Sequence, residues 1–309
     1  MGATRLGALL LALFLPACVP SFSDFDAFGR DPEQAPRGYE RFFSPYPHNF
    51  RYASKALGAP VRRGERSERY ELRTGDCGGS DCGNPRYRAE IRLTSEREIG
   101  KVGTETWFGW SFYNSSIPSF TRRDSLRLVF GQWTMGGDAS PAIRLIQLGT
   151  DEGNWKTCRP AICSGPEREA GDVVVQLEDL RRTFDWGEQE NEGYVCRLFD
   201  MAANRGRWVD LVMQTNFSQT TDGYLRIWVN GSLKCDYAGP ILSPRSLFEG
   251  NQPGHRRGIF SSYTTRWTET YGTRPKPTLV AYYDEFRIGA TREDVDPRWI
   301  EAEGRAPLD

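Results

Sequence analysis

Short runs of β-branched and aromatic residues recur along the chain, and they constrain its fold more than any other feature. Turn-forming pairs such as Asp222-Gly223 separate these runs, as they do in β-hairpins. Helical periodicity is scarce and is limited to a turn near 198–204 and a tail after Thr291. Many short strands with glycine-rich turns predict an all-β protein, a sandwich or jelly roll built as a single domain. The strands are expected at residues 68–73, 86–93, 106–113, 126–133, 142–148, 173–177, 208–216, 223–229, 257–263 and 278–288.

Four charged residues occupy every second position of one predicted strand: Arg86, Arg88, Glu90 and Arg92. Because successive side chains of a strand point to opposite faces, these four share one surface. A guanidinium group binds a carboxylate or sulfate through two parallel hydrogen bonds, so the pattern predicts the floor of a groove for an acidic ligand. A solvated strand face with cross-strand ion pairs would have the same pattern.

Aromatic residues gather on another predicted strand, which contains Trp107, Trp110, Phe112 and Tyr113. Aromatic rings on the concave side of a sandwich can stack on sugar rings. Most aromatic residues of strands, however, belong to the hydrophobic core, and both interpretations are open from the sequence.

The N-terminus has the composition of an export signal. An apolar run follows Arg5 and is too short to span a bilayer. The Leu-Pro-Ala-Cys sequence that ends at Cys18 is similar to a bacterial lipobox, although simple secretion is the alternative. We expect a secreted, periplasmic or outer-membrane lipoprotein of bacteria, with an export signal at residues 1–18, a leader at 19–50 and the β-domain at 51–309.

The cysteines suit an oxidising compartment. With Cys18 assigned to a lipid anchor, six remain, and two pairs of them have the same short spacing. The most economical pairing is Cys77–Cys82, Cys158–Cys163 and Cys196–Cys235, one of several connectivities that six cysteines allow. The second disulfide would close an insertion at residues 150–170. Zinc is the competing interpretation, but the spacing is not C-x2-C and the chain has only two histidines.

Arginine supplies most of the positive charge, because five of the 40 basic residues are lysine and the other 35 are arginine. This bias suits an anionic polymer, although a GC-rich genome would produce it as well. The formal net charge of -1 argues against a general nucleic-acid binder. No phosphate-binding loop, histidine metal cluster or Ser-His-Asp order occurs. We expect a monomer. No cofactor is expected, and a structural calcium ion is the one alternative. Any contact with a membrane would be through a lipid anchor.

Several short motifs follow one another in a fixed order between about residues 60 and 290. They include Arg88-Ala89-Glu90, Trp107-Phe108-Gly109-Trp110, Phe130-Gly131-Gln132-Trp133, Arg257-Gly258-Ile259-Phe260 and Tyr282-Tyr283-Asp284-Glu285-Phe286-Arg287. Together they resemble the heparin-lyase and glucuronan-lyase type of polysaccharide lyases, which share a concanavalin A-like jelly roll. The resemblance implies an acidic polysaccharide as the partner and its cleavage by β-elimination.

The resemblance also implies roles for individual residues. Arg88 and Gln132 match positions that would contact the uronate, and Glu90 would orient Arg88; alternatively, Arg88 and Glu90 only pair with each other. The expected substrate-binding residues are Arg88, Glu90, Arg92, Trp133, Arg256 and Arg257.

The sequence departs from the family at two positions where proton carriers are expected. Thr134 stands where members carry a histidine, and Phe260 stands where they carry a tyrosine. Neither side chain can act as an acid or base near neutral pH. His255 and Tyr263 are close in sequence, and Tyr263 would need a bulge before it to face the substrate. We name Tyr263, His255 and Gln132 as candidate catalytic residues.

Three functions are compatible with these observations. The first is a polysaccharide lyase that acts on a uronate-containing polymer. The second is a binding protein on the same scaffold that has lost its proton carriers. The third is a glycoside hydrolase, which ranks last because no E-x-D-x-x-E run occurs and the adjacent Asp284 and Glu285 would face opposite ways on a strand.

Overall fold

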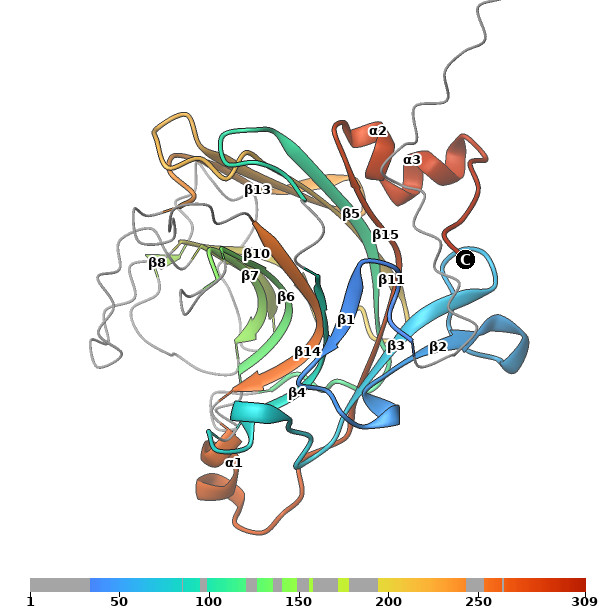
Figure 1. Ribbon diagram of the computed structural model, residues 1–309, viewed down its shortest axis with the longest axis vertical. Coiled ribbons are helices and arrows are strands. Elements are labelled where there is room, and N and C mark those ends of the chain that lie inside the picture. The colour runs from blue at the N-terminus through green and yellow to red at the C-terminus, as the bar shows by residue number, and fades with distance from the viewer. Residues whose placement is uncertain are drawn as a thin grey trace, which may run out of the picture.

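The structure is a computed structural model that describes residues 34–84, 86–94, 99–120, 127–135, 141–148, 156–157, 172–177, 194–242, 253–262 and 264–309. Within these residues the chain forms two β-sheets (Figure 1). The first has eight strands, in the order β1 (Tyr39–Phe42), β4 (Tyr87–Leu93), β14 (Gly254–Ser262), β6 (Arg127–Thr134), β7 (Ile143–Leu148), β9 (Asp172–Leu177), β10 (Tyr194–Asp200) and β8 (Lys156–Thr157). The second has seven, in the order β13 (Ser232–Ala238), β12 (Tyr224–Val229), β11 (Trp208–Thr215), β5 (Thr106–Asn114), β15 (Leu279–Gly289), β3 (Arg66–Leu72) and β2 (Phe50–Ser54).

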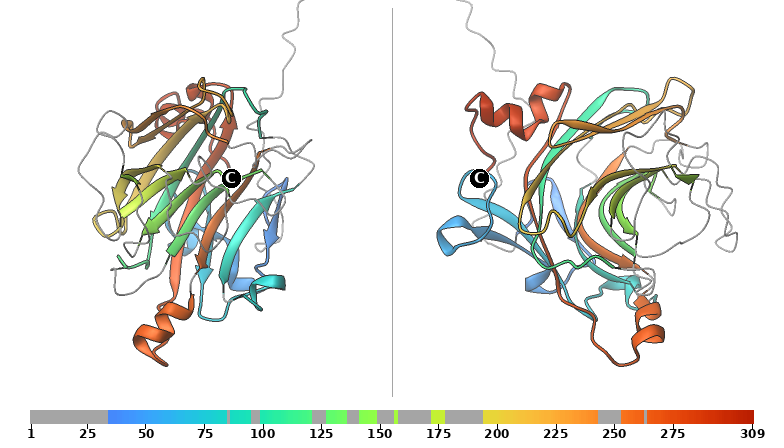
Figure 2. Two further views of the ribbon diagram at one scale, coloured as in Figure 1. Left: turned by 90° about the vertical axis from the view of Figure 1, so that its left-hand side faces the viewer. Right: turned by 180° about the vertical axis from the view of Figure 1, so that it is seen from behind.

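The two sheets form the layers of a sandwich, which Figure 2 shows from two further sides. One large hydrophobic core lies between them and includes Ile91 of β4, Phe108 of β5 and Tyr283 of β15. The eight-stranded sheet is curved, and the face that it turns away from the core is concave (Figure 1). We call this face the concave face.

Helices are few in the described part of the chain. The α-helices are α1 (Thr264–Tyr271), α2 (Arg292–Val295) and α3 (Pro297–Ala302), and three short 3-10 helices lie at Pro47–Asn49, Lys55–Leu57 and Gly79–Asp81. Helix α2 packs on the outer face of the seven-stranded sheet, where Val295 contacts a cluster formed by Trp107, Val212 and Trp228. None of the described helices has both the length and the apolar composition needed to cross a membrane.

The all-β sandwich predicted from the sequence is confirmed, and each of the ten predicted runs contains a strand. The helical tail after Thr291 is also confirmed, as α2 and α3. The turn predicted near 198–204 was wrong for its first part, because Phe199 and Asp200 pair with β9 in β10 and Leu198 is buried at a bulge of that strand. Residues 19–50, expected as a leader that packs over the domain, include β1, which pairs with β4 and is too short to show a strand period.

The expected alternation of β4 is confirmed. Ala89 and Ile91 lie in the core, whereas Arg88, Glu90 and Arg92 are on the concave face. Arg86 precedes the strand. In β5, Trp110 and Phe112 belong to the core, and Trp107 and Tyr113 lie on the outer face in two smaller clusters.

Two of the predicted disulfides are confirmed. Cys77 is bonded to Cys82, and Cys196 of β10 is bonded to Cys235 of β13, so the second disulfide joins the two sheets. The predicted Cys158–Cys163 pair and the lipid-bearing Cys18 lie outside the described residues, as does residue range 1–18.

Candidate functional site

Five polar side chains form a row across the concave face, one on each of five neighbouring strands. The strand register pairs Arg92 with Arg256, Arg256 with Gln132, Gln132 with Arg144, and Arg144 with Gln176. Residues directly opposite each other in an antiparallel sheet point to the same face. Because neighbouring strands are about 4.8 Å apart, the row is about 19 Å long. We call these five residues the polar row.

In each strand, side chains alternate between the core and the concave face, and this alternation determines which residues form the polar row. In β7, Ile143 and Leu145 lie in the core, and Arg144 between them points to the concave face. In β9, Val175 lies in the core and its neighbour Gln176 does not. We did not predict Arg144 or Gln176, although a polar residue between two apolar residues of a strand was a usable signal.

Arg88 lies beneath the surface of the concave face, between two carboxylates. Its Nε donates to Asp81 Oδ2 at 2.7 Å, its Nη2 donates to Asp81 Oδ1 at 3.3 Å, and its Nη1 donates to Glu90. Asp81 and Arg88 are buried, and Glu90 is 0% exposed. Burial alone would lower the pKa of Arg88, but Glu90 and Asp81 together raise it. The charge of this guanidinium is therefore balanced by two carboxylates of the protein itself.

Aromatic rings cover Arg88 on the remaining sides. Its guanidinium carbon lies 4.9 Å from the ring centre of Phe42 and 4.2 Å from that of Phe260. The guanidinium of Arg88 is thus engaged by two carboxylates and by aromatic rings of the protein itself. The structure thus gives Arg88 a supporting position in place of the direct contact that we expected. Asp81 was not predicted, because only the folded Cys77–Cys82 loop brings it to Arg88.

Gln132 is held in the polar row by the same buried carboxylate. Its side-chain nitrogen donates to Glu90 Oε1 at 2.8 Å, and Gln132 is 3% exposed. Ser44 accepts a hydrogen bond from the backbone N–H of Glu90 at 2.9 Å. Glu90 therefore orients both Arg88 and Gln132, which extends the role that we predicted for it.

Arg256 is the half-buried guanidinium at the centre of this arrangement. It stacks over the ring of Phe42 at 4.2 Å, and among the described residues it has no hydrogen bond or ion pair. Its neighbour Arg92 also lies over Phe42, at 4.4 Å, but is paired with Glu40 at 2.5 Å. Burial lowers the pKa of Arg256, and the nearby guanidiniums of Arg88 and Arg92 lower it further against the opposing effect of Glu90. A bound anion would stabilise the charged form of Arg256 against both its burial and the neighbouring positive charges.

Three predicted site residues face the core instead of the concave face. Trp133 and His255 are buried, with ring centres 5.1 Å apart, and His255 stacks on Phe286 at 4.4 Å. Arg257 is also buried. The reason is the two-residue period of a strand, because Trp133 follows Gln132 and both His255 and Arg257 flank Arg256. These three residues are therefore core residues and not substrate contacts.

The buried position of His255 predicts a loss of stability in acid. Burial and the charge of Arg257 hold the pKa of His255 well below its ordinary value, so the unfolded chain binds a proton there at a higher pH than the folded chain does. Below about pH 6.5 the free energy of unfolding should therefore fall, by up to about 1.4 kcal/mol per pH unit. In His255→Phe this dependence should be weaker, as denaturant titrations at several pH values would measure. Equal slopes for the two proteins would contradict the prediction.

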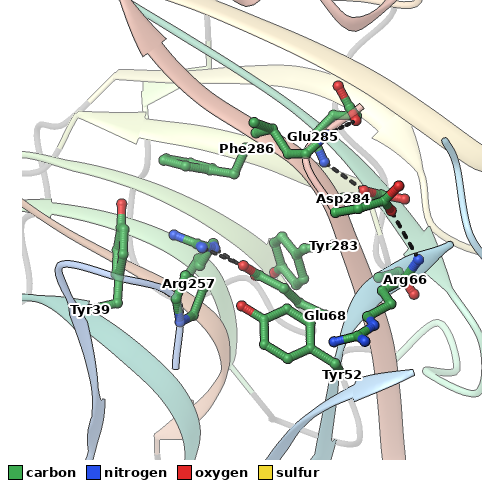
Figure 3. Close-up of a pocket in the computed structure, with 13 residues that line it drawn as sticks. Tyr39, Tyr52, Arg66, Glu68, Arg257, Tyr283, Asp284, Glu285 and Phe286 are labelled. Atoms are coloured by element: carbon green, nitrogen blue, oxygen red, sulfur yellow. Dashed lines mark hydrogen bonds and ion pairs between the residues drawn. The ribbon is translucent and has the colours of Figure 1, made fainter. Parts of the chain in front are cut away.

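A pocket lies between the sheets on the other side of β14, and Figure 3 shows the side chains that line it. Its volume is about 40 Å³, and Arg257 points into it from β14. Arg257 Nε donates to Glu68 Oε2 at 2.7 Å, and its Nη2 donates to Glu68 Oε1. Arg257 Nη1 and the hydroxyl of Tyr52 have no partner among the described residues. This pocket does not belong to the polar row, because β14 separates them.

The concave face is rich in guanidinium groups, but its described side chains include no histidine, lysine or tyrosine. Thr134 lies there opposite Gly254, and Phe260 covers Arg88. Tyr263, our candidate proton carrier, falls outside the described residues.

The tyrosine nearest to it in the described sequence, Tyr271, ends α1, and its ring centre lies 4.5 Å from that of Trp267. No group of three or more histidine, cysteine, aspartate or glutamate side chains in the described part is placed to hold a metal ion.

Comparison with known proteins agrees with the fold. The polysaccharide lyase family model matches residues 48–287, so the chain belongs to the polysaccharide lyase family, a class of carbon-oxygen lyases. The solved structure of an endo-β-1,4-glucuronan lyase from the fungus Trichoderma reesei matches with a TM-score of 0.56 at 15% identity, over 86% of this chain and 97% of that chain. An alginate lyase from Alteromonas sp. 272 matches with a TM-score of 0.43 at 11% identity, over 77% of this chain and 92% of that chain. No curated protein sequence matches.

Proposed function

We propose that this lyase binds a uronate-containing polysaccharide on the concave face and cleaves it by β-elimination there. The observation that carries the proposal is Arg256, a guanidinium without an ionic partner among the described residues, which lies between Arg92 and Gln132 in the polar row. Neutralising the uronate carboxylate makes the proton at C5 more acidic, which is the first requirement of the reaction.

The proposed mechanism assigns the groups of the concave face as follows. Arg256 binds the uronate carboxylate, and Gln132, oriented by Glu90, provides a second polar contact. A base removes the C5 proton, the electron pair of that C–H bond forms the C4–C5 double bond, the C4–O bond breaks, and the leaving oxygen takes up a proton. Tyr263 directly follows β14 in the chain and is our candidate proton carrier.

The polar row also supports a direction for the polymer. It runs across the strands, with guanidinium groups on β4, β14 and β7 from Arg92, Arg256 and Arg144. Strands are about 4.8 Å apart, which is close to the length of one sugar unit of an extended polymer. We propose that the polymer lies along the row, with uronate carboxylates beside these arginines.

We further propose that the protein is exported by bacteria and is either released or held by a lipid on Cys18. The two disulfides support an oxidising compartment, and the apolar run after Arg5 supports an export signal.

A second candidate function is acidic-polysaccharide binding without catalysis. It is favoured by the positions of Thr134 and Phe260, which lie on the concave face where the resemblance implies a histidine and a tyrosine. On this alternative the polar row would bind the polymer in the same way and release it unchanged.

One experiment tests the proposal and separates the two candidates. The mature protein is incubated with polyglucuronate, polymannuronate, polyguluronate and, as a neutral control, xylan, and the ultraviolet absorbance of the C4–C5 double bond is followed. We expect absorbance to rise with at least one uronate polymer and not with xylan. Binding to a uronate polymer without a rise in absorbance would support the second candidate and overturn the first.

A further inference from the structure

The outer face of the seven-stranded sheet carries a second row of side chains, on the opposite side of the sandwich from the polar row. The register pairs Trp208 with Tyr113, Tyr113 with Tyr282, Tyr282 with Arg69, and Arg69 with Arg51. These residues lie on the neighbouring strands β11, β5, β15, β3 and β2. We call them the outer row.

The aromatic half of the outer row forms a small cluster separate from the main core. Ring centres lie 5.3 Å apart for Tyr113 and Trp208 and 5.8 Å apart for Tyr113 and Tyr282. Tyr113 and Trp208 remain partly exposed. Helix α2 covers the same sheet at another level, where the backbone of Val295 approaches Gly109 so closely that a Cβ there would clash. Gly109 is four residues from Tyr113 along β5.

The arginine half of the outer row has an excess of positive charge. Arg51 lies directly opposite Arg69, and like charges in this position are destabilising. Arg69 and Arg73 both contact Glu71, so two guanidinium groups share one carboxylate, and Arg51 adds a third positive charge beside them. Arg51 is exposed and has no ion pair among the described residues, and Nη1 of Arg69 has no partner there either. An anionic ligand would offset this repulsion.

We infer that the outer row binds a second stretch of anionic polysaccharide, away from the concave face. The inference rests on the proposed function for the nature of the polymer. Aromatic rings offer flat apolar surfaces for sugar rings, and arginines bind carboxylates through paired hydrogen bonds. Five strands at about 4.8 Å spacing give the outer row a length of about 19 Å, the same as the polar row. The outer row has no role in the chemistry; it holds polymer beside the enzyme.

The test measures retardation of the protein in native gels that contain polyglucuronate, with hydroxyethyl cellulose gels as the neutral reference. All proteins carry Arg256→Met, which weakens polymer binding on the concave face and limits cleavage of the polymer during the run. Adding Arg51→Glu or Trp208→Ala should weaken the remaining binding about five- to tenfold, and added salt should weaken it further. The matched control is Arg226→Glu, which changes a partly exposed arginine of the same sheet that is already paired with Asp236.

The outcomes separate this inference from the proposed function. If the parent protein neither binds nor cleaves any uronate polymer, the proposed function fails first. If the parent binds and cleaves but Arg51→Glu and Trp208→Ala are retarded as strongly as Arg226→Glu, the outer row is not a binding site. Arg51 is exposed on an edge strand, so Arg51→Glu keeps the test valid even if Trp208→Ala disturbs folding. Retardation equal to that in the neutral gel for every protein would also overturn the inference.

Discussion

Replacing Arg256 by methionine should lower kcat/KM for a cleaved uronate polymer by about 10- to 150-fold. A charge-assisted hydrogen-bonded contact contributes about 1.5–3 kcal/mol, and each 1.4 kcal/mol corresponds to about tenfold. Methionine keeps an apolar chain of similar length against Phe42, so the loss would report the guanidinium group. The fold should not suffer, because burial and the charges of Arg88 and Arg92 disfavour a cation at this position.

Arg92→Met is the matched control for this experiment. Arg92 lies over the same ring, at 4.4 Å, but it is more exposed and already paired with Glu40. We expect kcat/KM of Arg92→Met to fall by no more than about threefold, because Arg92 would meet the polymer as an exposed charge already shared with Glu40, and such charges contribute little. Equal losses in the two variants would show that general positive charge, and not Arg256, attracts the substrate. Unchanged kcat/KM in Arg256→Met would remove the central assignment of the site.

The sequence was sufficient to predict the sandwich and the shared face of Arg88, Glu90 and Arg92, because both follow from the period of two in a strand. It was not sufficient to show which guanidinium is free. The partner of Arg88, Asp81, comes from a disulfide-closed loop, and its covering ring, Phe42, comes from a segment that has no periodicity. Ion pairs between such segments exist only once the chain is folded.

The adjacent Arg256 and Arg257 show the same limit more sharply. Alternation requires that they face opposite sides, but the sequence does not say which of them faces the core. The register between β14 and β6 shifts between Arg257 and Phe260, so counting from the Gly-Ile-Phe motif with a regular period is unsafe. Only the position of Glu68 on β3, far away in the sequence, reveals that Arg257 is the interior arginine.

That interior pair predicts the largest change in stability. Arg257 is 3% exposed and lies between the rings of Tyr39 and Phe286, at 4.2 and 4.3 Å, with Glu68 as its ionic partner. Removing one partner of a buried ion pair leaves an uncompensated charge. Glu68→Ala should therefore lower the free energy of unfolding by about 3–5 kcal/mol, measured by denaturant titration.

Two further variants would show whether this loss comes from the unpaired charge. Glu40→Ala removes a carboxylate from an exposed pair with Arg92 and should change stability little. The double variant Glu68→Leu with Arg257→Met replaces both charges by apolar groups and should recover most of the stability, because well-packed apolar residues can replace a buried ion pair. A double variant as unstable as Glu68→Ala would instead show that the shape of the Glu68 and Arg257 side chains, and not their charge, supports the packing of β3 against β14.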